Sequence, residues 1–323
     1  MSRELDPIDH VLSLDLSRRG ITRFFVPGGA LAAAQVLHGA RRVLITTGFT
    51  LANGVPETDG PPGAAVLGAA LARLGAEVTY VSDAVNVPLL AACLKTLEHP
   101  AEIHLFPDSL EAAQALLARE RPTHLLGIER PGRTVAGEYL SARGESVAPW
   151  NRPLDELFFC SGCRAAGITR AWADRGPRRH RHPRGWSGPL TVGIGDGGNE
   201  IGMGNVWARV ARISPLMKRI ASTVRVDHLV VAPVSNWGGY GVVAALSRLA
   251  GRPLLHDACL ERRLVEACVE AGAQDGLTRR REATVDGLPV EIHAAVVTLL
   301  GRCMMNAAST RGRASARRRR KAS

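Results

Sequence analysis

Aromatic residues, long apolar runs and cysteines are all scarce in this sequence, and each shortage excludes a class of protein. Aromatics make up only 4% of the 323 residues, too few for a surface that binds nucleobases by stacking. No apolar run approaches the ~18 residues of a membrane span, and residues 1–10 are too acidic to predict a signal peptide. Six scattered cysteines are typical of reduced thiols rather than of a disulfide framework. We therefore expect a cytoplasmic protein with no membrane partner.

The net charge of +11 comes from two short segments. Residues 311–321 hold seven basic residues and no acid, and residues 164–184 hold seven arginines and one acid, so the rest of the chain sums to about −2. Because the C-terminal segment has no aromatics and no helical period, we predict a disordered, solubilising tail over residues 311–323 and no specific nucleic-acid partner. Polyanion binding by these basic segments is the alternative.

Short β-branched runs alternate with Ala- and Leu-rich amphipathic stretches along the chain. This alternation is typical of a parallel sheet covered by helices on both faces. We therefore predict an α/β fold, a three-layer, doubly wound and mostly parallel sheet (Rossmann-like), in one domain over residues 1–310 with an arginine-rich insert at about 170–189. The expected strands are Val43–Thr47, Glu77–Val81, Glu102–Phe106, Thr123–Ile128, Leu190–Ile194 and His228–Val231. The expected helices are Ala64–Leu74, Val87–Leu97, Ser109–Arg119, Leu154–Ala166, Gly204–Ile220, Gly239–Leu249, Glu261–Ala271 and Glu291–Asn306.

The unusual glycine-rich and polar loops all follow predicted strands. They comprise residues 47–49, 57–63, 127–133, 193–204 and 235–239. The carboxyl ends of parallel strands meet at one edge of a sheet, and open α/β sheets bind their ligands there. The sequence therefore predicts a single polar cleft at this edge.

The loop 193–204 is the most informative of these segments. Three of its glycines fit the G-x-G-x-x-G spacing of a dinucleotide site, but position 218, where an acid would hold the ribose, is a lysine. We therefore expect no nucleotide cofactor. Glycines let the backbone approach a ligand, and the interleaved Asp196, Asn199 and Glu200 favour a cation, an amine or a proton to be moved. A tight turn with capping acids is the alternative.

Two further loops each carry an acid. Asp59 lies in a loop stiffened by two prolines, a rigid setting for a carboxylate, and capping of the following helix is the alternative role. Glu129 precedes Arg130 and Arg133, whose guanidiniums are suited to bidentate binding of a carboxylate. A solvated surface ion pair is the alternative for this second group.

The remaining motifs each have a simple structural alternative. Asn236 lies where a helix begins, and free N–H groups there favour an anion. Asp286-Gly287 predicts a hairpin turn. His293 is a candidate proton carrier, although a histidine at a helix start is more often structural. Cys160 and Cys163 have C-x-x-C spacing, but the downstream histidines lie too close together for a zinc site, so neither a metal nor a redox role is favoured.

Taken together and in order, these loops resemble the catalytic C-terminal domain of the D-glutamate cyclase family. The similar segments are Thr47–Phe49, Glu57–Ala64, Ile128–Arg133, Gly195–Asn205, Ser235–Tyr240 and Val285–Pro289. The similarity covers about residues 41–300, and the insert at 170–189 is a departure from it. The resemblance implies a lyase that converts D-glutamate, its small-molecule partner, to 5-oxo-D-proline and water, with Mg²⁺ or Mn²⁺ as a possible cofactor. An inactive amino-acid-binding protein of the same fold is the alternative.

The implied reaction gives the predicted residues their expected roles. The α-amine must lose a proton, the side-chain carboxylate must be protonated or bound to a cation, and the α-carboxylate needs an anchor. The expected catalytic residues are Asp59, Asp196, Glu200 and His293, and Asp196 and Glu200 are also the expected metal ligands. The expected substrate-binding residues are Thr47, Gly48, Glu129, Arg130, Arg133, Asn199, Asn236 and Gly238.

Overall fold

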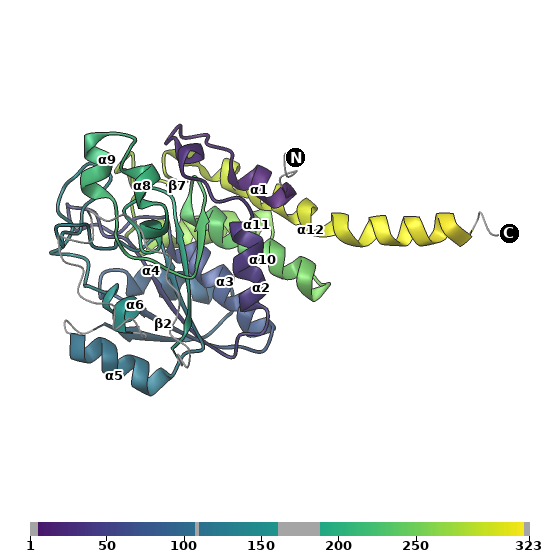
Figure 1. The fold of residues 1–323 in the computed structure, drawn as a ribbon, viewed down its shortest axis with the longest axis horizontal. Helices are drawn as coiled ribbons and strands as arrows, with labels where there is room; N and C mark the ends of the chain where they lie inside the picture. The colour runs from purple at the N-terminus through teal and green to yellow at the C-terminus, as the bar shows by residue number, and fades with distance from the viewer. Residues whose placement is uncertain (1–5, 107–109, 161–187, 320–323) are drawn as a thin grey trace.

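The protein is built around a central sheet of six parallel strands (Figure 1). The computed structural model describes residues 6–106, 110–160 and 188–319. The strands are β1 (Arg42–Thr47), β2 (Glu77–Ser82), β3 (Glu102–Leu105), β4 (His124–Ile128), β5 (Leu190–Gly195) and β6 (His228–Val231). They lie in the order β3-β2-β1-β4-β5-β6, and every neighbouring pair is parallel. This is the order of a doubly wound sheet, so the predicted fold class is confirmed.

Helices cover both faces of this sheet and make the fold three-layered (Figure 1). One face carries α1 (Pro7–Leu12), α2 (Gly29–Leu37), α3 (Pro61–Arg73), α4 (Val87–Thr96), α10 (Ser235–Ala250), α11 (Ala258–Glu270) and α12 (Val290–Arg319). The other face carries α5 (Leu110–Glu120) and α6 (Glu156–Cys160). The connections contain the 3₁₀ turns η1 (Ile21–Arg23) and η2 (Met203–Asn205), the short helices α8 (Trp207–Val210) and α9 (Pro215–Ile220), and the hairpin of β7 (Thr284–Val285) and β8 (Leu288–Pro289).

The two faces of the sheet bury separate hydrophobic cores because side chains alternate along each strand. On β1, Val43 and Ile45 join the larger core, whereas Leu44 joins the smaller one. On β4, Leu126 and Leu125 are divided in the same way. Burial on both faces explains why these strands read as continuous apolar runs in the sequence.

The strand order reverses between β1 and β4, which lie side by side at the centre of the sheet. The register pairs Thr47 with Ile128, so both strands end at the same level. The connections that leave them diverge in opposite directions and open a crevice at the carboxyl edge. In doubly wound sheets this crevice is the usual place for a ligand.

Two expectations about helices differ from the structure. A single helix over Gly204–Ile220 is wrong, because the segment forms η2, α8 and α9. The break occurs where Ser214 accepts a hydrogen bond from the Met217 N–H and Pro215 begins α9. Residues 7–37, for which the sequence analysis predicts no element, form α1, η1 and α2.

The basic segments lie at the limits of the described structure. The insert at 170–189 falls outside the described residues, except for its last two positions. Cys163 and the rest of the helix that was expected to continue to Ala166 also lie outside them. Helix α12 extends away from the body (Figure 1) and passes beyond its expected end at Asn306 to Arg319. It thus enters the segment 311–323, whose disorder stays a prediction.

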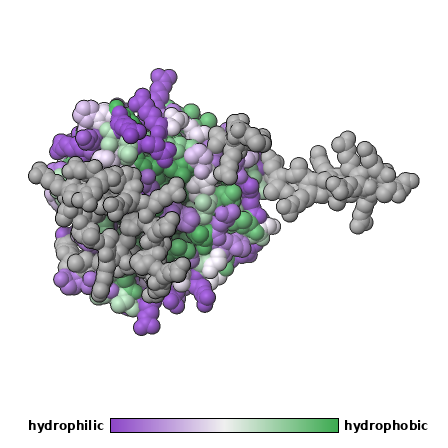
Figure 2. All heavy atoms as spheres, viewed as in Figure 1, coloured by the Kyte–Doolittle hydropathy of each residue, from purple (hydrophilic) through white to green (hydrophobic). Residues whose placement is uncertain are grey.

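The surface of the described residues mixes polar and apolar side chains, as the face in Figure 2 shows. The large apolar side chains that are exposed, such as Leu16, Leu105 and Trp150, come from separate parts of the chain. Among the described helices, none combines the length and the apolar character needed to cross a bilayer.

Candidate active site

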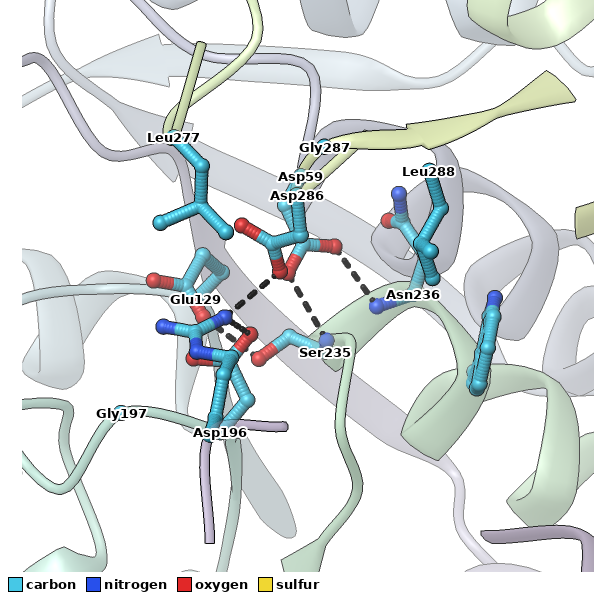
Figure 3. A network of polar contacts seen from close by, with 12 residues as sticks. Asp59, Glu129, Asp196, Gly197, Ser235, Asn236, Leu277, Asp286, Gly287 and Leu288 are labelled. Atoms are coloured by element: carbon cyan, nitrogen blue, oxygen red, sulfur yellow. Dashed lines mark hydrogen bonds and ion pairs between the residues drawn. The ribbon is translucent and has the colours of Figure 1, made fainter. Parts of the chain in front are cut away.

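Three carboxylates from three loops meet at the carboxyl edge of the sheet (Figure 3). Asp59 follows β1, Glu129 follows β4 and Asp196 follows β5. One oxygen atom of each lies within 4.8 Å of those of the other two, and all three side chains are buried. We call these three residues the acid cluster. The loops were expected to converge on one cleft, and the acid cluster is the point at which they do.

Asp59 is fixed by the first turn of α10. Its Oδ2 accepts a hydrogen bond from the Ser235 backbone N–H at 2.8 Å, and its Oδ1 accepts one from the Asn236 N–H at 2.8 Å. The Asn236 side chain acts in return, because its Oδ1 accepts from the N–H groups of Gly60 at 3.0 Å and Gly63 at 2.8 Å, where α3 begins. Each helix start therefore receives its capping oxygen from the other helix's start. The anion expected at the first turn of α10 is the carboxylate of Asp59.

Glu129 adopts an unusual backbone conformation to reach the acid cluster. Its φ is 41°, in the left-handed region that non-glycine residues rarely occupy. Gly60 faces it with a φ of 101°, and a Cβ on Gly60 would lie only 2.8 Å from the Cβ of Glu129. The Ser235 hydroxyl donates to Glu129 Oε2 at 2.5 Å. Strain of this kind gathers at functional positions, where the surrounding structure holds it in place.

Arg19, between α1 and η1, supplies a positive charge to the acid cluster. Its Nη1 lies 2.7 Å from Asp196 Oδ2 and 2.7 Å from Asp286 Oδ2. Asp286 forms the expected hairpin turn with Gly287, between β7 and β8. The sequence analysis missed both residues as site residues. Arg19 belongs to no motif, and the turn explained Asp286 without a role for its carboxylate.

The acids of the loop after β5 play different parts. Glu200 accepts hydrogen bonds from the backbone N–H groups of Gly197 at 2.6 Å and Gly198 at 2.9 Å, so both of its oxygens shape the loop. Asn199 donates to the Leu140 carbonyl at 2.8 Å and ties this loop to its neighbour. Of the two expected metal ligands, Asp196 lies in the acid cluster and Glu200 does not.

Burial dominates the proton affinity of these groups. It raises the pKa of Asp59 from 3.8 to about 7. Burial, and then repulsion from neighbouring acids, raises the pKa of Glu57 and of Glu129 well above the ordinary range. The pKa of Asp196 rises for the same first reason, although the Arg19 guanidinium opposes the rise. Burial thus favours the protonated forms of these carboxyl groups, which suits them to donate and accept protons.

Arg130 and Arg133, the expected anchors for a substrate carboxylate, are bound to acids of this chain. Arg130 is fully buried, forms an ion pair with Asp83 and donates to the Gly48 carbonyl at 2.9 Å. Arg133 forms an ion pair with Asp155 at 2.8 Å. Neither guanidinium lines the cavity described below. Their acidic partners lie far away in the sequence, so no local spacing could have revealed them.

His293 is held at both ring nitrogens. The Trp237 Nε1–H donates to His293 Nδ1 at 2.8 Å, and His293 Nε2 lies 3.2 Å from the Leu288 carbonyl oxygen. Because an indole N–H can only donate, Nδ1 is the acceptor and Nε2 carries the proton. The buried ring thus links α10, α12 and β8. This geometry favours the structural interpretation of His293.

Three further predicted residues border the same loops. The Thr47 hydroxyl is buried and has no hydrogen-bond partner among the described residues. Gly48 packs against Asn86, and a Cβ there would lie 2.4 Å from the amide carbon of that side chain. Gly238 packs against Ile194 of β5, where an added Cβ would lie 2.5 Å from a methyl group. Both glycines therefore serve close packing.

A cavity opens beside the acid cluster. Its empty space, counted together with the solvent-open space at its mouth, is about 470 Å³. Its lining includes the carboxyl groups of Glu57, Glu129 and Asp286 and the amide of Asn199. The cationic residues of the lining are Arg19, Arg143 and Arg279. A ligand in the cavity would thus meet both acids and guanidiniums.

The acid cluster also fits a divalent cation. Its three carboxylates are the hard oxygen donors that Mg²⁺ and Mn²⁺ prefer. In addition, Asp196 Oδ1 is buried and has no hydrogen-bond partner in the described part of the chain. Buried polar atoms are rarely left unsatisfied, so this oxygen is available to a ligand.

Comparison with known proteins agrees with the geometry of the site. A family model described as "D-glutamate cyclase-like, C-terminal" matches residues 8–171 and 180–301. The human protein "D-glutamate cyclase, mitochondrial" is 35% identical over 267 residues, and the match covers 76% of this chain and 39% of the human protein. An exopolyphosphatase-related protein from Bacteroides fragilis aligns over 85% of this chain and 56% of its own at a TM-score of 0.40 and 10% identity, a likeness without bearing on function. The chain belongs to the D-glutamate cyclase-like family.

Proposed function

We propose that this protein is a lyase that cyclises D-glutamate to 5-oxo-D-proline with loss of water. Membership of the family and the 35% identity to the human D-glutamate cyclase support this activity. The observation that carries the proposal is the buried acid cluster beside a cavity that Glu129 also lines. The chain spans only about two fifths of the human protein's length, so the activity is tested below on this chain itself.

The reaction requires proton transfers within the site but consumes no proton overall. D-Glutamate carries an α-ammonium group and two carboxylates. The nitrogen loses a proton and attacks the side-chain carboxyl carbon, so that a C–N bond forms and a C–O bond breaks. Two of the three ammonium protons end on the departing oxygen as water, and the product keeps the net charge of the substrate. Carboxyl groups with raised pKa values are suited to this exchange.

We assign the proton transfers to Glu129, because its carboxyl group both lines the cavity and belongs to the acid cluster. The Ser235 hydroxyl orients this carboxyl through its hydrogen bond. Asp59 and Asp196 keep their expected catalytic roles by sharing the protons and charge of the cluster. Arg19, also in the lining, stabilises the negative oxygen of the tetrahedral intermediate.

Several expected site residues act as supports in this proposal. Glu200 shapes the loop that carries Asp196, and His293 fixes the start of α12 against α10. Arg130 joins the ends of β2 and β4. Thr47 and Asn199 stay in their expected role of binding substrate, since the first has a free hydroxyl and the second lines the cavity.

We further propose that Asp59, Glu129 and Asp196 hold a divalent cation, which when bound would act as a Lewis acid on a substrate carboxylate. Mn²⁺ is expected to raise the melting temperature of the wild-type protein but not that of Asp196→Asn. An equal rise in both proteins would place the cation elsewhere.

We also propose that the protein works in the cytoplasm. Cys93 of α4 and Cys268 of α11 are free thiols whose Sγ atoms lie 3.3 Å apart. Two neighbouring thiols of this kind suit a reducing compartment. Imaging of a fluorescent fusion in the source cells would check this assignment.

The activity is tested by incubating the purified protein with D- or L-glutamate, with and without Mn²⁺, and separating the 5-oxoproline enantiomers by chiral chromatography. We expect 5-oxo-D-proline from D-glutamate. The Glu129→Gln variant should lose about 10²-fold or more in turnover, the scale of a lost acid–base group. Glu138→Gln, which changes an exposed acid, should keep wild-type activity. Saturable binding of D-glutamate without product would identify an inactive amino-acid-binding protein instead.

A further inference from the structure

A D-glutamate molecule in the cavity needs a partner for its α-carboxylate. Arg130 and Arg133 are excluded because neither residue lines the cavity. Since the acids of the lining would repel this group, the partner must come from the cationic residues that border the cavity.

Among the three lining arginines, Arg279 is the one with a buried and unused donor. Arg19 donates to two carboxylates of the chain and is assigned above to the oxygen of the tetrahedral intermediate. Arg143 is exposed and donates to the Leu277 carbonyl at 2.8 Å. The Arg279 side chain is only 25% exposed, and its Nε–H is buried without a hydrogen-bond partner in the described structure. A buried guanidinium N–H without an acceptor is costly, so the site favours an anionic ligand at this position.

Neighbouring side chains hold Arg279 in place. Its Nη2 forms an ion pair with Glu145, which lies on the loop of the lining residues Ser141 and Arg143. Its backbone has a φ of 59°, and its N–H donates to the Asp275 carbonyl at 2.9 Å. The Asp275 side chain accepts from the Leu277 N–H at 2.8 Å and from the Gly287 N–H at 2.7 Å. The loop of Arg279 is therefore fixed to the hairpin turn that brings Asp286 to the site.

We propose that Arg279 determines substrate specificity by binding the α-carboxylate of an acidic amino acid in the cavity. This role rests on the proposed function. It adds to that function the recognition of the α-carboxylate, which takes no part in ring closure. The planar guanidinium is suited to a carboxylate, whereas the ammonium group of the same substrate is suited to the acids that line the cavity. Glu145 acts as the positioning residue for Arg279.

The experiment compares D-glutamate with 4-aminobutanoate, which has the amine and the carboxylate that close the ring but no α-carboxylate. Dissociation constants are measured by calorimetry for the wild type, Arg279→Gln, Arg279→Lys and Arg280→Gln. Arg280 is the matched control, because it is the next residue along the loop and is 71% exposed. We expect Arg279→Gln to weaken D-glutamate binding about 10- to 100-fold and to leave 4-aminobutanoate binding unchanged. Arg279→Lys should bind D-glutamate with an affinity between those of the wild type and Arg279→Gln. Arg280→Gln should match the wild type.

Each outcome separates this proposal from the proposed function. If Arg279→Gln binds D-glutamate like the wild type, or weakens both ligands equally, the subsite is overturned while the cyclase activity stands on its own assay. If the wild type binds D-glutamate through Arg279 but forms no 5-oxoproline, the subsite is supported and the cyclase activity fails. A wild type that binds no D-glutamate overturns both.

Discussion

At the scale of single residues, the site concentrates carboxyl groups that are buried and short of positive charge. Glu57, Asp59, Glu129 and Asp196 are each no more than 6% exposed. Ionising all of them together would place several like charges in a region of low dielectric constant, which is unfavourable. Their protonation state therefore couples the stability of the protein to pH.

Asp59 makes this coupling measurable. Its pKa rises from 3.8 in the unfolded chain to about 7 in the folded protein. The folded state thus retains a proton that the unfolded chain releases, so this stabilisation is complete below pH ~4 and is lost as the pH rises to ~7. The melting temperature of the ligand-free protein should fall between pH ~4 and ~7, and Asp59→Asn, which cannot titrate, should show a shallower fall. An unchanged slope in this variant would mean that Asp59 does not carry the proton, and Glu138→Gln serves as the exposed control.

The acids of the site were easier to predict from the sequence than the ion-pair partners of its charged residues. Asp59, Glu129 and Asp196 were predictable because each follows a strand, and the ends of parallel strands must meet. The positions of guanidiniums depend on contacts between distant segments. Arg130 was therefore expected at the substrate although Asp83 binds it, and Arg19 was missed altogether.

At the scale of elements, α3 and α10 cap each other through one side chain from each helix start, Asp59 and Asn236. Gly239 of α10 lies against Gly63 of α3, and an added Cβ there would be 3.0 Å from the Gly63 carbonyl oxygen. At this close approach a single amide, that of Asn236, reaches two N–H groups of the neighbouring helix start. The first turns of both helices are thereby fixed beside the acid cluster.

Replacing Asn236 with Ala removes the acceptor of the Gly63 N–H and one of the two acceptors of the Gly60 N–H, which keeps Asp59 Oδ1. A buried donor left without a partner costs about 1–3 kcal/mol, so the melting temperature should fall by several degrees. Thermal unfolding followed by circular dichroism measures the change. Asn53→Ala, at an exposed position whose hydrogen bonds are 3.3 Å long, is the matched control. Equal stability of the two variants would show that the reciprocal cap contributes little.

The elements of the central sheet were predictable because burial on both faces leaves apolar, β-branched runs between polar loops. The elements around the site were less so. The segment 204–220 has the composition of one helix, yet Ser214 and Pro215 begin a new one within it. Residues 7–37 hold short helices whose packing depends on α10 rather than on a long period of their own.

At the scale of the whole molecule, we expect the body to be stable without the basic C-terminal segment. The buried apolar side chains described on α12 include Ala294, Val296, Val297 and Leu300, which precede residues 311–323. We therefore predict that deleting residues 311–323 leaves the melting temperature and the cyclase activity unchanged. Retention on heparin should fall, because the deletion removes seven basic residues. A large loss of thermal stability would show that the segment packs on the body.

The contacts of Arg19 have a consequence for how the protein is made. They span 177 residues to Asp196 and 267 residues to Asp286, so a guanidinium near the start of the chain meets carboxylates synthesised much later. On the ribosome, the early strands can pair before the last hairpin has emerged, but the site cannot yet assemble. Assembly of the candidate site is therefore a late event in biogenesis, and a nascent chain released before the β7–β8 hairpin lacks the Asp286 partner of Arg19.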